Sequence, residues 1–596
     1  MPKIKINQID KELEAKPGEN ILEVLQREGI DINAYCGGFG YCGKCIIQIL
    51  KGDVTHPTSQ EIKHLKDKLS QGFRLACQTQ IIEDVEIDIH ESIIQKIEVL
   101  AESGEAHLEE LPVKKINIQL KKPSLNHSLS LQEVVETQLP TSHFIRNWTI
   151  QALQELSRIE NQDEKNFEIG FDEKQIYWVS SEVKRASLLG IAFDIGTTTL
   201  ACELLDLETG STLYRAGALN RQASFGADVL SRLRAIQDNQ GVLTTLQELL
   251  ISSMNDLIQE ACQKTGKDPN RILSVTVAGN TIMEHLFLGV SPISIGIAPF
   301  TPVFCRSHTT NARSLHLVVH PEAQVYVFPS VAGYVGGDIV AGIGAHDLEN
   351  NNSILLYVDI GTNGEIVFSD RGKIYCCGTA AGPAFEGAQI KHGTRATLGA
   401  IHSVEIENSD LKIYTIGDVA PRGVCGTGLI DALACLIKGG SVASNGRLQK
   451  DDHLLSSRIL EEGKSHYFIL SYDPRIIITQ EDISQLQLAK AALQAGRKVL
   501  LHQANREESD IDQVILAGAF GSFINPESAM IVGLIPRVEK VSSVGNASLF
   551  GAKKALLSRA FREKVEKLAK KAQYIELSAR SDFQEYFYES LIFEKN

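Results

Sequence analysis

The chain has 596 residues, 43% of them hydrophobic, and a formal net charge of −15 from 59 Lys and Arg against 74 Asp and Glu. This composition excludes a disordered or fibrous protein, and the acidic balance argues against binding of nucleic acid or anionic membranes, because phosphate groups attract clustered Lys and Arg. No apolar run of about 18 residues and no signal-peptide core is present, so we expect a cytoplasmic protein without a membrane partner.

The first predicted elements are a short strand and a helix. Apolar and polar residues alternate over residues 3–9, which is typical of a strand, and Pro17 and Gly18 then mark a turn. The apolar residues from Ile21 to Leu25 follow helical spacing, and we expect this helix to stop at Gly29.

Four of the 11 cysteines are clustered near the start of the chain: Cys36, Cys42, Cys45 and Cys77, separated by gaps of five, two and 31 residues. Four thiolates on one small domain can bind zinc or an iron–sulfur cluster. Structural zinc sites more often pair two C-x2-C motifs, and only one is present here. The glycine-rich loop around Cys36–Cys45 favours a cluster instead, because it lets the backbone wrap the cluster and direct N–H groups at the sulfides.

These residues resemble the [2Fe–2S] ferredoxins of the β-grasp fold, with the five-residue first gap of the adrenodoxin-like members. The resemblance covers residues 1–91. It implies that Cys36, Cys42, Cys45 and Cys77 hold a [2Fe–2S] cluster.

A linker and a small domain are predicted next. Residues 92–111 carry several glutamates and end before Pro112, which is typical of a linker. Residues 112–187 contain a strand candidate over residues 113–120 and a helical pattern through Leu153 and Leu156. We expect a small α+β middle domain that acts as a spacer or a docking unit, since no group of chemically active residues is found there.

The remaining sequence, residues 188–596, contains an internal repeat. An apolar strand that ends in Asp-Ile-Gly-Thr occurs at Asp194 and again at Asp359, and a hairpin follows each copy. A second pair of strands, residues 275–280 and 514–519, closes on Ala-Gly in the later part of each half. We therefore expect two similar α/β lobes, over about 188–350 and 351–596, that face each other across a cleft.

The repeated motif suits phosphate chemistry. Glycine lets the backbone approach a polyphosphate, and successive N–H groups can surround its oxygens. A carboxylate at the strand end can hold Mg²⁺ through water or orient the attacking water, so Asp194 and Asp359 are the candidate catalytic residues. A G-x-x-x-x-G-K-[ST] motif is absent from the sequence, which excludes a P-loop.

The repeat is similar to the acetate and sugar kinase/Hsp70/actin superfamily (ASKHA). The resemblance implies a duplicated actin-like ATPase domain that binds ATP and Mg²⁺. The implied nucleotide-binding residues are Gly196, Thr197, Thr198 and Thr199 in the first phosphate motif, Gly361, Thr362, Asn363 and Gly364 in the second, Gly518 and Gly521 in the adenosine motif, and Gly426, Thr427 and Gly428 at a glycine-rich helix start lining the cleft.

Three further residues have two interpretations each. Asp338 follows two glycines and serves either the magnesium shell or a turn. His285 is interpreted as structural rather than catalytic, and Cys425 as a buried small residue rather than a ligand. Dehydratase activators of the same superfamily bridge a [4Fe–4S] cluster with two cysteines per chain. Because the expected partner spacing to Cys425 is missing, we do not expect such a cluster.

Taken over the whole chain, the order of domains resembles the reductive activators of corrinoid proteins. That resemblance implies a homodimer that takes an electron from a donor we do not identify, docks on a corrinoid protein of a methyltransferase system and reduces Co(II) cobalamin to Co(I) at the expense of ATP. Three alternatives stay open: an ATP-driven electron donor to another low-potential enzyme, a non-catalytic nucleotide-binding redox sensor, and a sugar or acyl kinase.

Overall fold

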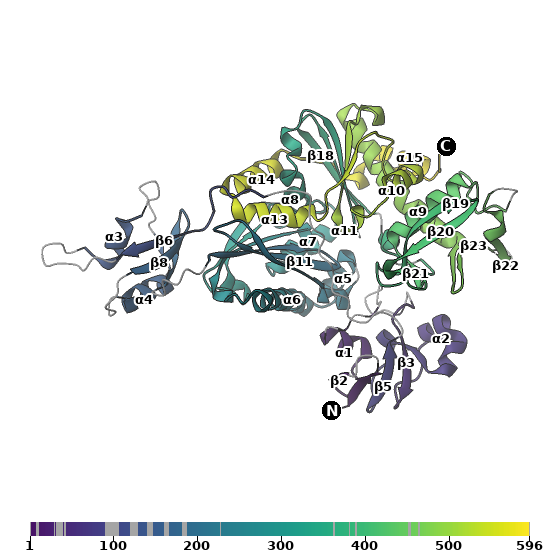
Figure 1. The fold of residues 1–596 in the computed structure, drawn as a ribbon, viewed down its shortest axis with the longest axis horizontal. Helices are drawn as coiled ribbons and strands as arrows, with labels where there is room; N and C mark the ends of the chain where they lie inside the picture. The colour runs from purple at the N-terminus through teal and green to yellow at the C-terminus, as the bar shows by residue number, and fades with distance from the viewer. Residues whose placement is uncertain are drawn as a thin grey trace.

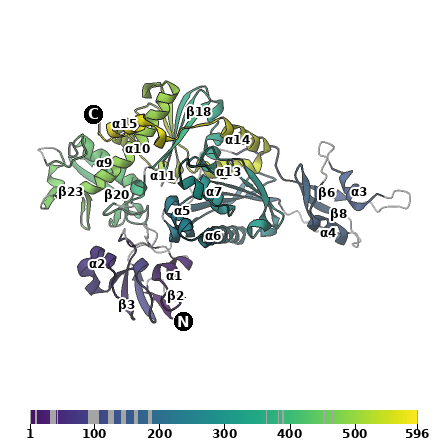
Figure 2. The same ribbon diagram turned by 180° about the vertical axis from the view of Figure 1, so that it is seen from behind.

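The computed structural model describes residues 2–7, 11–28, 30, 32, 40, 43–89, 106–119, 129–139, 147–159, 166–180, 187–226, 228–361, 364–380, 382–387, 390–450, 454–462 and 465–594. Figures 1 and 2 show two small units, one at the N-terminus and one over residues 112–187, attached at different ends of a large two-lobed unit. Within the described ranges, no helix combines the length and apolar character needed to cross a membrane.

The N-terminal unit is a five-stranded sheet with a helix packed on it, as a β-grasp fold requires. Its elements are β1 (Lys3–Ile6), β2 (Lys11–Glu14), α1 (Ile21–Arg27), β3 (Ile46–Lys51), α2 (Ser59–Leu65), η2 (Lys66–Gln71), β4 (Phe73–Leu75), η3 (Ala76–Gln78) and β5 (Val85–Ile89). The strand order is β2-β1-β5-β3-β4, with β1 and β5 parallel. Leu22 and Leu25 of α1 are buried against Ile4, Ile6 and Ile47 of the sheet. The predicted fold of this unit is confirmed, although its first strand is shorter than expected.

The unit over residues 112–187 is a small α+β domain, as predicted. Its elements are β6 (Lys114–Gln119), α3 (Leu131–Glu136), β7 (Asn147–Trp148), α4 (Ile150–Ile159), β8 (Asn166–Phe171) and β9 (Gln175–Ser180), with strand order β6-β8-β9-β7. It is attached to the large unit through Arg271, whose guanidinium lies 3.2 Å from the Glu168 carboxylate and stacks 4.8 Å from the Trp178 ring.

The first lobe of the large unit is a six-stranded sheet in the order β12-β11-β10-β13-β15-β14. Its elements are β10 (Leu189–Ile195), β11 (Thr199–Asp206), β12 (Thr212–Leu219), η4 (Arg221–Phe225), α5 (Val229–Asp238), α6 (Gly241–Thr265), β13 (Ile272–Gly279), α7 (Thr281–Phe287), β14 (His308–Asn311), β15 (Gln324–Val327) and α8 (Gly337–Ala345). Apolar residues of α5, α6 and α7 pack on one face of this sheet and form the lobe's main core.

The second lobe repeats this arrangement and adds two small three-stranded sheets, β20-β19-β21 and β22-β23-β24. Its main sheet has the order β26-β25-β16-β17-β18-β27. Its elements are β16 (Ile354–Ile360), β17 (Gly364–Asp370), β18 (Lys373–Thr379), β19 (Ala400–Glu407), β20 (Asp410–Thr415), β21 (Gly423–Val424), α9 (Gly426–Lys438), β22 (Ile459–Glu462), β23 (Ser465–Tyr472), β24 (Arg475–Thr479), α10 (Gln480–Ala504), β25 (Gln513–Ala517), α11 (Gly518–Gly521), α12 (Pro526–Val532), β26 (Val541–Ser543), α13 (Ala547–Leu557), α14 (Arg559–Lys571), β27 (Gln573–Tyr574) and α15 (Ser581–Glu589).

The strand registers of the two lobes match. In the first lobe the antiparallel strands β12-β11-β10 are followed by β13 and β15, which run parallel to β10. In the second lobe the antiparallel strands β18-β17-β16 are followed in the same way by β25 and β26. Asp194 lies beside Ala278, and Asp359 lies beside Ala517. The structure therefore confirms the predicted duplication and brings each Asp motif next to its Ala-Gly strand end.

Two helices, α8 and α13, join the lobes. Although α13 belongs to the second half of the duplicated sequence, it packs on β10 and β13 of the first lobe, and the Thr276 hydroxyl donates to the carbonyl of Ala552 at 2.7 Å. The helices cross at glycines: a Cβ on Gly551 would overlap the backbone carbonyl of Ala341. Because the helices are this close, the start of each reaches the ends of β10 and β16.

Candidate functional site

Four carboxyl groups from both lobes face one another at the ends of β10 and β16. Asp194 and Asp359 occupy equivalent positions in those strands, and Glu365 lies directly opposite Asp359 on β17. Asp338 stands in the first turn of α8. All four residues are half-buried. The structure thus brings together the two predicted catalytic residues and adds Asp338 and Glu365.

Mutual repulsion is visible in the pKa values of this carboxylate group. Burial, together with the charges of Asp359 and Asp194, raises the pKa of Asp338 to about 8. Burial and Asp194 raise the pKa of Asp359 to about 7. Burial and the charges of Asp338 and Asp359 raise the pKa of Glu365 well above its ordinary value. A cation bound between such acids would stabilise their ionised forms.

Asp194 is held by two donors at the start of α13. The Asn546 amide donates to one carboxylate oxygen and the Ser548 hydroxyl to the other, both at 2.8 Å. Burial raises the pKa of Asp194, and these two hydrogen bonds act against that rise. The Asn546 carbonyl oxygen also caps α13 by accepting from the Leu549 N–H at 2.9 Å. The cap therefore fixes the donor that orients Asp194.

The donor set suits a hydrated Mg²⁺ bound to a phosphate. In the part of the chain that the structure describes, no three His, Cys, Asp or Glu side chains converge closely enough to enclose a metal on their own. Mg²⁺ keeps several waters and is held by one or two carboxylates plus substrate phosphates, and Asp194 and Asp359 are two such carboxylates. The carboxylates present therefore fit the ion.

The predicted first phosphate turn lies between β10 and β11. A Cβ on Gly196 would stand 2.7 Å from the Thr199 carbonyl oxygen, so the turn requires glycine there. The Thr197 hydroxyl accepts a hydrogen bond of 3.1 Å from the amide of Asn280, which follows β13. Thr198 is partly exposed, and Thr199 opens β11 with its side chain exposed. This turn is packed against the second strand-end motif of the same lobe.

The second phosphate turn is described at its two ends. Gly361 follows β16 and is partly exposed. Gly364 opens β17, and a Cβ there would overlap the Leu493 side chain of α10. Thr362 and Asn363 lie outside the described residues. The described ends place this turn beside Asp359, where the repeat predicts it.

The other predicted glycines differ in how strongly packing requires them. Gly518 has φ of +84°, and a Cβ there would stand 2.5 Å from the Asp359 carboxylate. By contrast, a Cβ on Gly521 would make only ordinary contacts, the nearest at 3.6 Å. Gly426 and Gly428 at the start of α9 are both pressed against backbone carbonyls, those of Phe385 and Ile401. Packing alone therefore explains every one of these glycines except Gly521.

Two residues with a structural interpretation have partners that agree with it. One ring nitrogen of His285 lies 2.7 Å from the Thr281 carbonyl, and the other accepts from the Val303 N–H at 3.1 Å. Cys425 is buried as the N-cap of α9, with its sulfur 3.4 Å from the Ile401 carbonyl. The Thr427 hydroxyl is also engaged, since it donates to the carbonyl of His402 at 2.8 Å.

Two of the predicted cluster cysteines lie side by side in the N-terminal unit. Cys45 precedes β3 and Cys77 lies in η3 after β4, and the Ala76 N–H donates to the Cys45 carbonyl at 2.8 Å. Both cysteines are buried, with 1% and 4% of their surface exposed. Cys36 and Cys42 lie outside the described residues. Paired buried cysteines beside a glycine-rich loop fit a [2Fe–2S] cluster.

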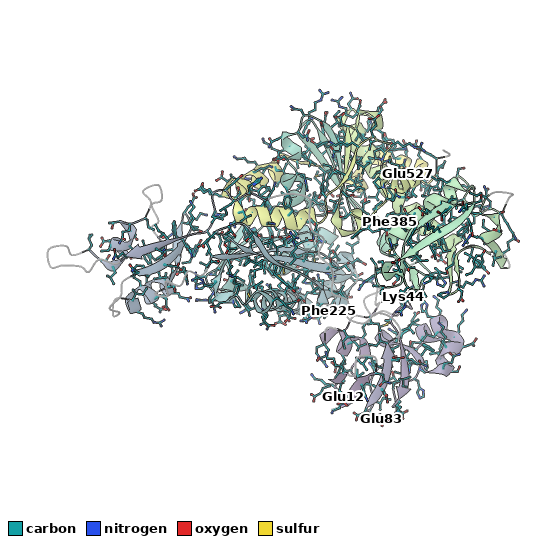
Figure 3. The ribbon with its side chains drawn as sticks, in the orientation of Figure 1. Glu12, Lys44, Glu83, Phe225, Phe385 and Glu527 are labelled. Atoms are coloured by element: carbon teal, nitrogen blue, oxygen red, sulfur yellow. The ribbon has the colours of Figure 1, made fainter. Side chains whose placement is uncertain are left out.

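The loop that carries these cysteines touches the large unit. Lys44, next to Cys45, donates to the backbone carbonyls of Ile390 and Lys391 at 2.9 and 2.8 Å (Figure 3). On the first lobe, α1 contacts η4. The N-terminal unit therefore rests on both lobes, with its cysteine loop against the second.

Fold and site together define a protein in which a [2Fe–2S] ferredoxin unit is fused to an ASKHA domain. Three family models match: a 2Fe-2S iron-sulfur cluster binding domain over residues 4–81, the RACo middle region over 189–351, and the C-terminal ASKHA domain of RACo over 353–596. The RACo middle region is thus the first lobe, a different segment from the small unit over 112–187.

Relatives match the whole length of the chain. The corrinoid activation enzyme RamQ of Eubacterium limosum is 30% identical to this chain, and the alignment covers 99% of this chain and 98% of RamQ. The [Co(II) methylated amine-specific corrinoid protein] reductase of Methanosarcina barkeri is 24% identical over 67% of this chain and 76% of its own length. The solved structure of a reductive activator for corrinoid,iron-sulfur protein is 33% identical, covers 100% of this chain and 98% of its own, and has a TM-score of 0.74. The chain belongs to this family of corrinoid-protein activators.

Four residues of the site escaped the sequence analysis as candidates. Glu365 stands inside the predicted motif, and its position opposite Asp359 could have been inferred from the hairpin. Asn280 directly follows a recognised Ala-Gly strand end. Asn546 and Ser548 have only a helix-cap pattern in the sequence, and nothing there links them to Asp194, which lies 352 residues from Asn546.

Proposed function

We propose that this protein activates a corrinoid protein reductively, passing one electron to Co(II) cobalamin to regenerate Co(I), and that ATP hydrolysis drives the step. The observation that carries the proposal is the contact of Lys44 with Ile390 and Lys391. It joins the cysteine loop physically to the lobe that carries Asp359. The full-length similarity to RamQ and to the solved activator supports the same function.

In the N-terminal unit, Cys36, Cys42, Cys45 and Cys77 would hold the cluster. When bound, a [2Fe–2S] cluster supplies a reversible one-electron couple, and the cobalt of the corrinoid protein is the substrate that accepts the electron. The burial of Cys45 and Cys77 keeps water from the side of the site that faces the sheet. Lys44 places a positive charge beside the loop, which favours an electron-rich site.

In the large unit, the carboxylate group would bind ATP through Mg²⁺. Asp194 and Asp359 would hold the ion from the two lobes, and the Mg²⁺ would neutralise negative charge on the phosphates. Asn546 and Ser548 hold Asp194 in place, and an aspartate or Glu365 orients the attacking water. The glycine-rich turns at Gly196 and Gly361 let the backbone approach the phosphates.

Coupling to ATP is useful because Co(II) cobalamin is a very poor electron acceptor. For a one-electron step, each gap of about 59 mV costs a factor of ten in the equilibrium constant. ATP carries no electrons, so its hydrolysis has to act through motion between the lobes or separation of the two proteins. Helices α8 and α13 pass that motion to both halves of the site, since each carries a residue of the carboxylate group or its support.

The test is an anaerobic absorbance assay with the cluster-loaded full chain, a low-potential reductant and a Co(II) corrinoid protein, with and without Mg-ATP. We expect the Co(I) band only with ATP. Cys77→Ser should abolish it, and Cys262→Ser, a buried cysteine of α6, should not.

Asn546→Asp keeps the cap of α13 but sets a like charge against Asp194, so turnover should fall at least about tenfold. Asn525→Asp, which makes the same change at the N-cap of α12, is the matched control.

The absorbance assay can give three distinct results. Co(I) formed at equal rates without ATP would contradict the coupling. If ATP is hydrolysed and the cluster is reducible but no corrinoid protein from several methyltransferase systems is reduced, the protein is a donor to another low-potential enzyme. Co(I) dependent on ATP and on Cys77 supports the proposal.

A further inference from the structure

The first phosphate turn is anchored from behind through three successive carbonyl groups. The side-chain amide of Asn220 donates to the Gly196 carbonyl at 2.9 Å, and the backbone N–H of Asn220 donates to the Thr198 carbonyl at 2.9 Å. The Thr197 carbonyl between them accepts from the guanidinium of Arg232 at 2.5 Å. The peptide groups that carry these three carbonyls are therefore held in one orientation.

Arg232 is an unusual residue for this place. It is fully buried, and its other donors go to the Gly226 carbonyl at 3.1 Å and the Gln222 side-chain oxygen at 2.9 Å. Within the described residues, no carboxylate lies within ion-pair distance of its guanidinium. Burial lowers the pKa of Arg232 to about 9, with the charge of Asp228 acting in the opposite direction. A buried guanidinium without a paired anion is costly to fold and calls for a compensating role.

The network continues from Arg232 to the start of η4. The Gln222 oxygen that accepts from Arg232 also accepts from the Asn220 amide at 3.3 Å, and the Gln222 amide donates to the Leu246 carbonyl of α6 at 2.8 Å. Asn220, Gln222 and Arg232 are all essentially inaccessible to water. These three side chains form one rigid support, tied to α6, underneath the turn.

Anchoring the carbonyls fixes the direction of the N–H groups. In a trans peptide the C=O of one residue and the N–H of the next point in opposite directions. Carbonyls of Gly196, Thr197 and Thr198 that point back into the support therefore direct the N–H groups of Thr197, Thr198 and Thr199 the other way, out of the support. The fixed positive charge of Arg232 lies behind the same peptide units.

We propose that Arg232 is a positioning residue for the phosphate chain of the nucleotide, holding the first turn ready for an anion and placing a positive charge behind that turn. This inference rests on the proposed ATP binding and goes beyond it, because it assigns phosphate recognition to a buried cation that does not touch the ligand. Charges act at longer range in a low-dielectric interior than in water, so contact is not required.

The test compares binding of Mg-ADP with binding of adenosine by calorimetry on the full chain. In Arg232→Met we expect affinity for Mg-ADP to fall about tenfold or more while affinity for adenosine is unchanged, since adenosine has no phosphates. Arg232→Lys should restore much of the loss, because it keeps the charge. Arg562→Met is the matched control: Arg562 is also a buried guanidinium without an ion pair among the described residues, and it donates to Ser274, next to the far end of β10 from Asp194.

A second variant covers the case in which Arg232→Met does not fold. Asn220→Ala removes the Gly196 anchor and leaves the buried charge, and it should also weaken Mg-ADP but not adenosine. The inference is overturned if both ligands weaken equally in the folded variants, or if neither changes. If the wild-type chain binds neither ATP nor ADP, the proposed function fails instead, so the two failures are distinguishable.

Discussion

Asp359 is the residue at which the charges of the two lobes meet. Glu365 lies opposite it on the neighbouring strand. Gly518 lies close to its carboxylate, and only the lack of a side chain at Gly518 leaves room for that group. Its raised pKa results from burial and from Asp194 of the other lobe. Without a bound cation, the ionised form of this residue opposes folding, so the site stores a repulsion that nucleotide and Mg²⁺ would relieve.

Asp359→Asn should change the way the protein's stability depends on pH. An acid with a pKa raised on folding keeps its proton in the folded chain after the unfolded chain has lost it, so its contribution to stability is lost as pH rises from about 4 through about 7. We expect the variant to gain about 1–2 kcal/mol of unfolding free energy at pH 8 and little at pH 4, and to show a flatter pH profile between. Urea unfolding in EDTA without nucleotide measures this, with the exposed Asp238→Asn as control. A gain that is the same at both pH values would contradict it.

At the scale of elements, α8 and α13 decide how the two half-sites meet. Asp338 stands at the start of α8, and the donors to Asp194 stand at the start of α13. The contact at Gly551 sets the distance between the helix axes, because backbone atoms of Ala341 fill the space that a Cβ would need. A change in that spacing would move carboxylates of both lobes.

We therefore predict that Gly551→Ala lowers stability by about 1–3 kcal/mol, the usual effect of overpacking where backbone has to shift. ATP hydrolysis should fall as well, since Asn546 moves with the helix. Thermal unfolding without nucleotide measures the first effect. Gly521→Ala is the control, because its added Cβ meets nothing closer than 3.6 Å. Equal melting temperatures for both variants would argue against this role of the helix contact.

In the N-terminal unit, α2 is tied to the strand that precedes Cys77 by a buried ion pair. Glu61 is fully buried and accepts from the Arg74 guanidinium at 2.8 and 3.1 Å and from the Leu75 N–H at 3.1 Å. Burial alone would raise the pKa of Glu61, but Arg74 and the N–H groups of Thr58 and Leu75 outweigh it and lower that pKa. The carboxylate is thus ionised and shared between helix and strand.

Glu61→Gln should leave Arg74 buried without its partner and cost about 3–5 kcal/mol. Because β4 leads directly to Cys77, we expect the cluster's visible absorbance to be lost at a lower temperature than in the wild type. Glu86→Gln, which removes the pair between the half-buried Glu86 and the exposed Lys51, should change little. A cluster that survives to the wild-type temperature in Glu61→Gln would show that the pair does not support the cysteine loop.

For the whole molecule, the N-terminal unit spans the two lobes near the elements predicted to bind nucleotide. Lys44 binds the carbonyls of Ile390 and Lys391, and residues 392–394 continue from there into hydrogen bonds with Val424, just before α9. On the other side, α1 touches η4, which carries Gln222 of the support under the first phosphate turn (Figure 3, where Phe225 marks η4). A movement of either lobe would therefore displace the cysteine-bearing unit.

We predict that Lys44→Met detaches this unit from the second lobe. Hydrogen–deuterium exchange should become faster at residues 390–394, and the radius of gyration from X-ray scattering should increase. Lys51→Met is the matched control, because Lys51 belongs to the same unit and, among the described residues, its ion pair is with Glu86 at the surface. Unchanged exchange and unchanged scattering in Lys44→Met would exclude Lys44 as the attachment.

The sequence by itself determined the units, the duplicated lobes and the positions of Asp194, Asp359 and their glycines, because strand periodicity, turns and short motifs are local patterns and parallel strands bring their ends together. The homodimer, the set of four cluster cysteines and the catalytic and nucleotide-binding roles of the site residues stay predictions, and the electron donor is not identified. Only the tertiary structure decided that Asn546 and Ser548 hold Asp194, that Arg232 lies behind the first phosphate turn, and that Lys44 joins the cysteine loop to the second lobe. Each of these contacts joins distant parts of the chain, and its geometry follows from how helices and lobes pack, which no local pattern encodes.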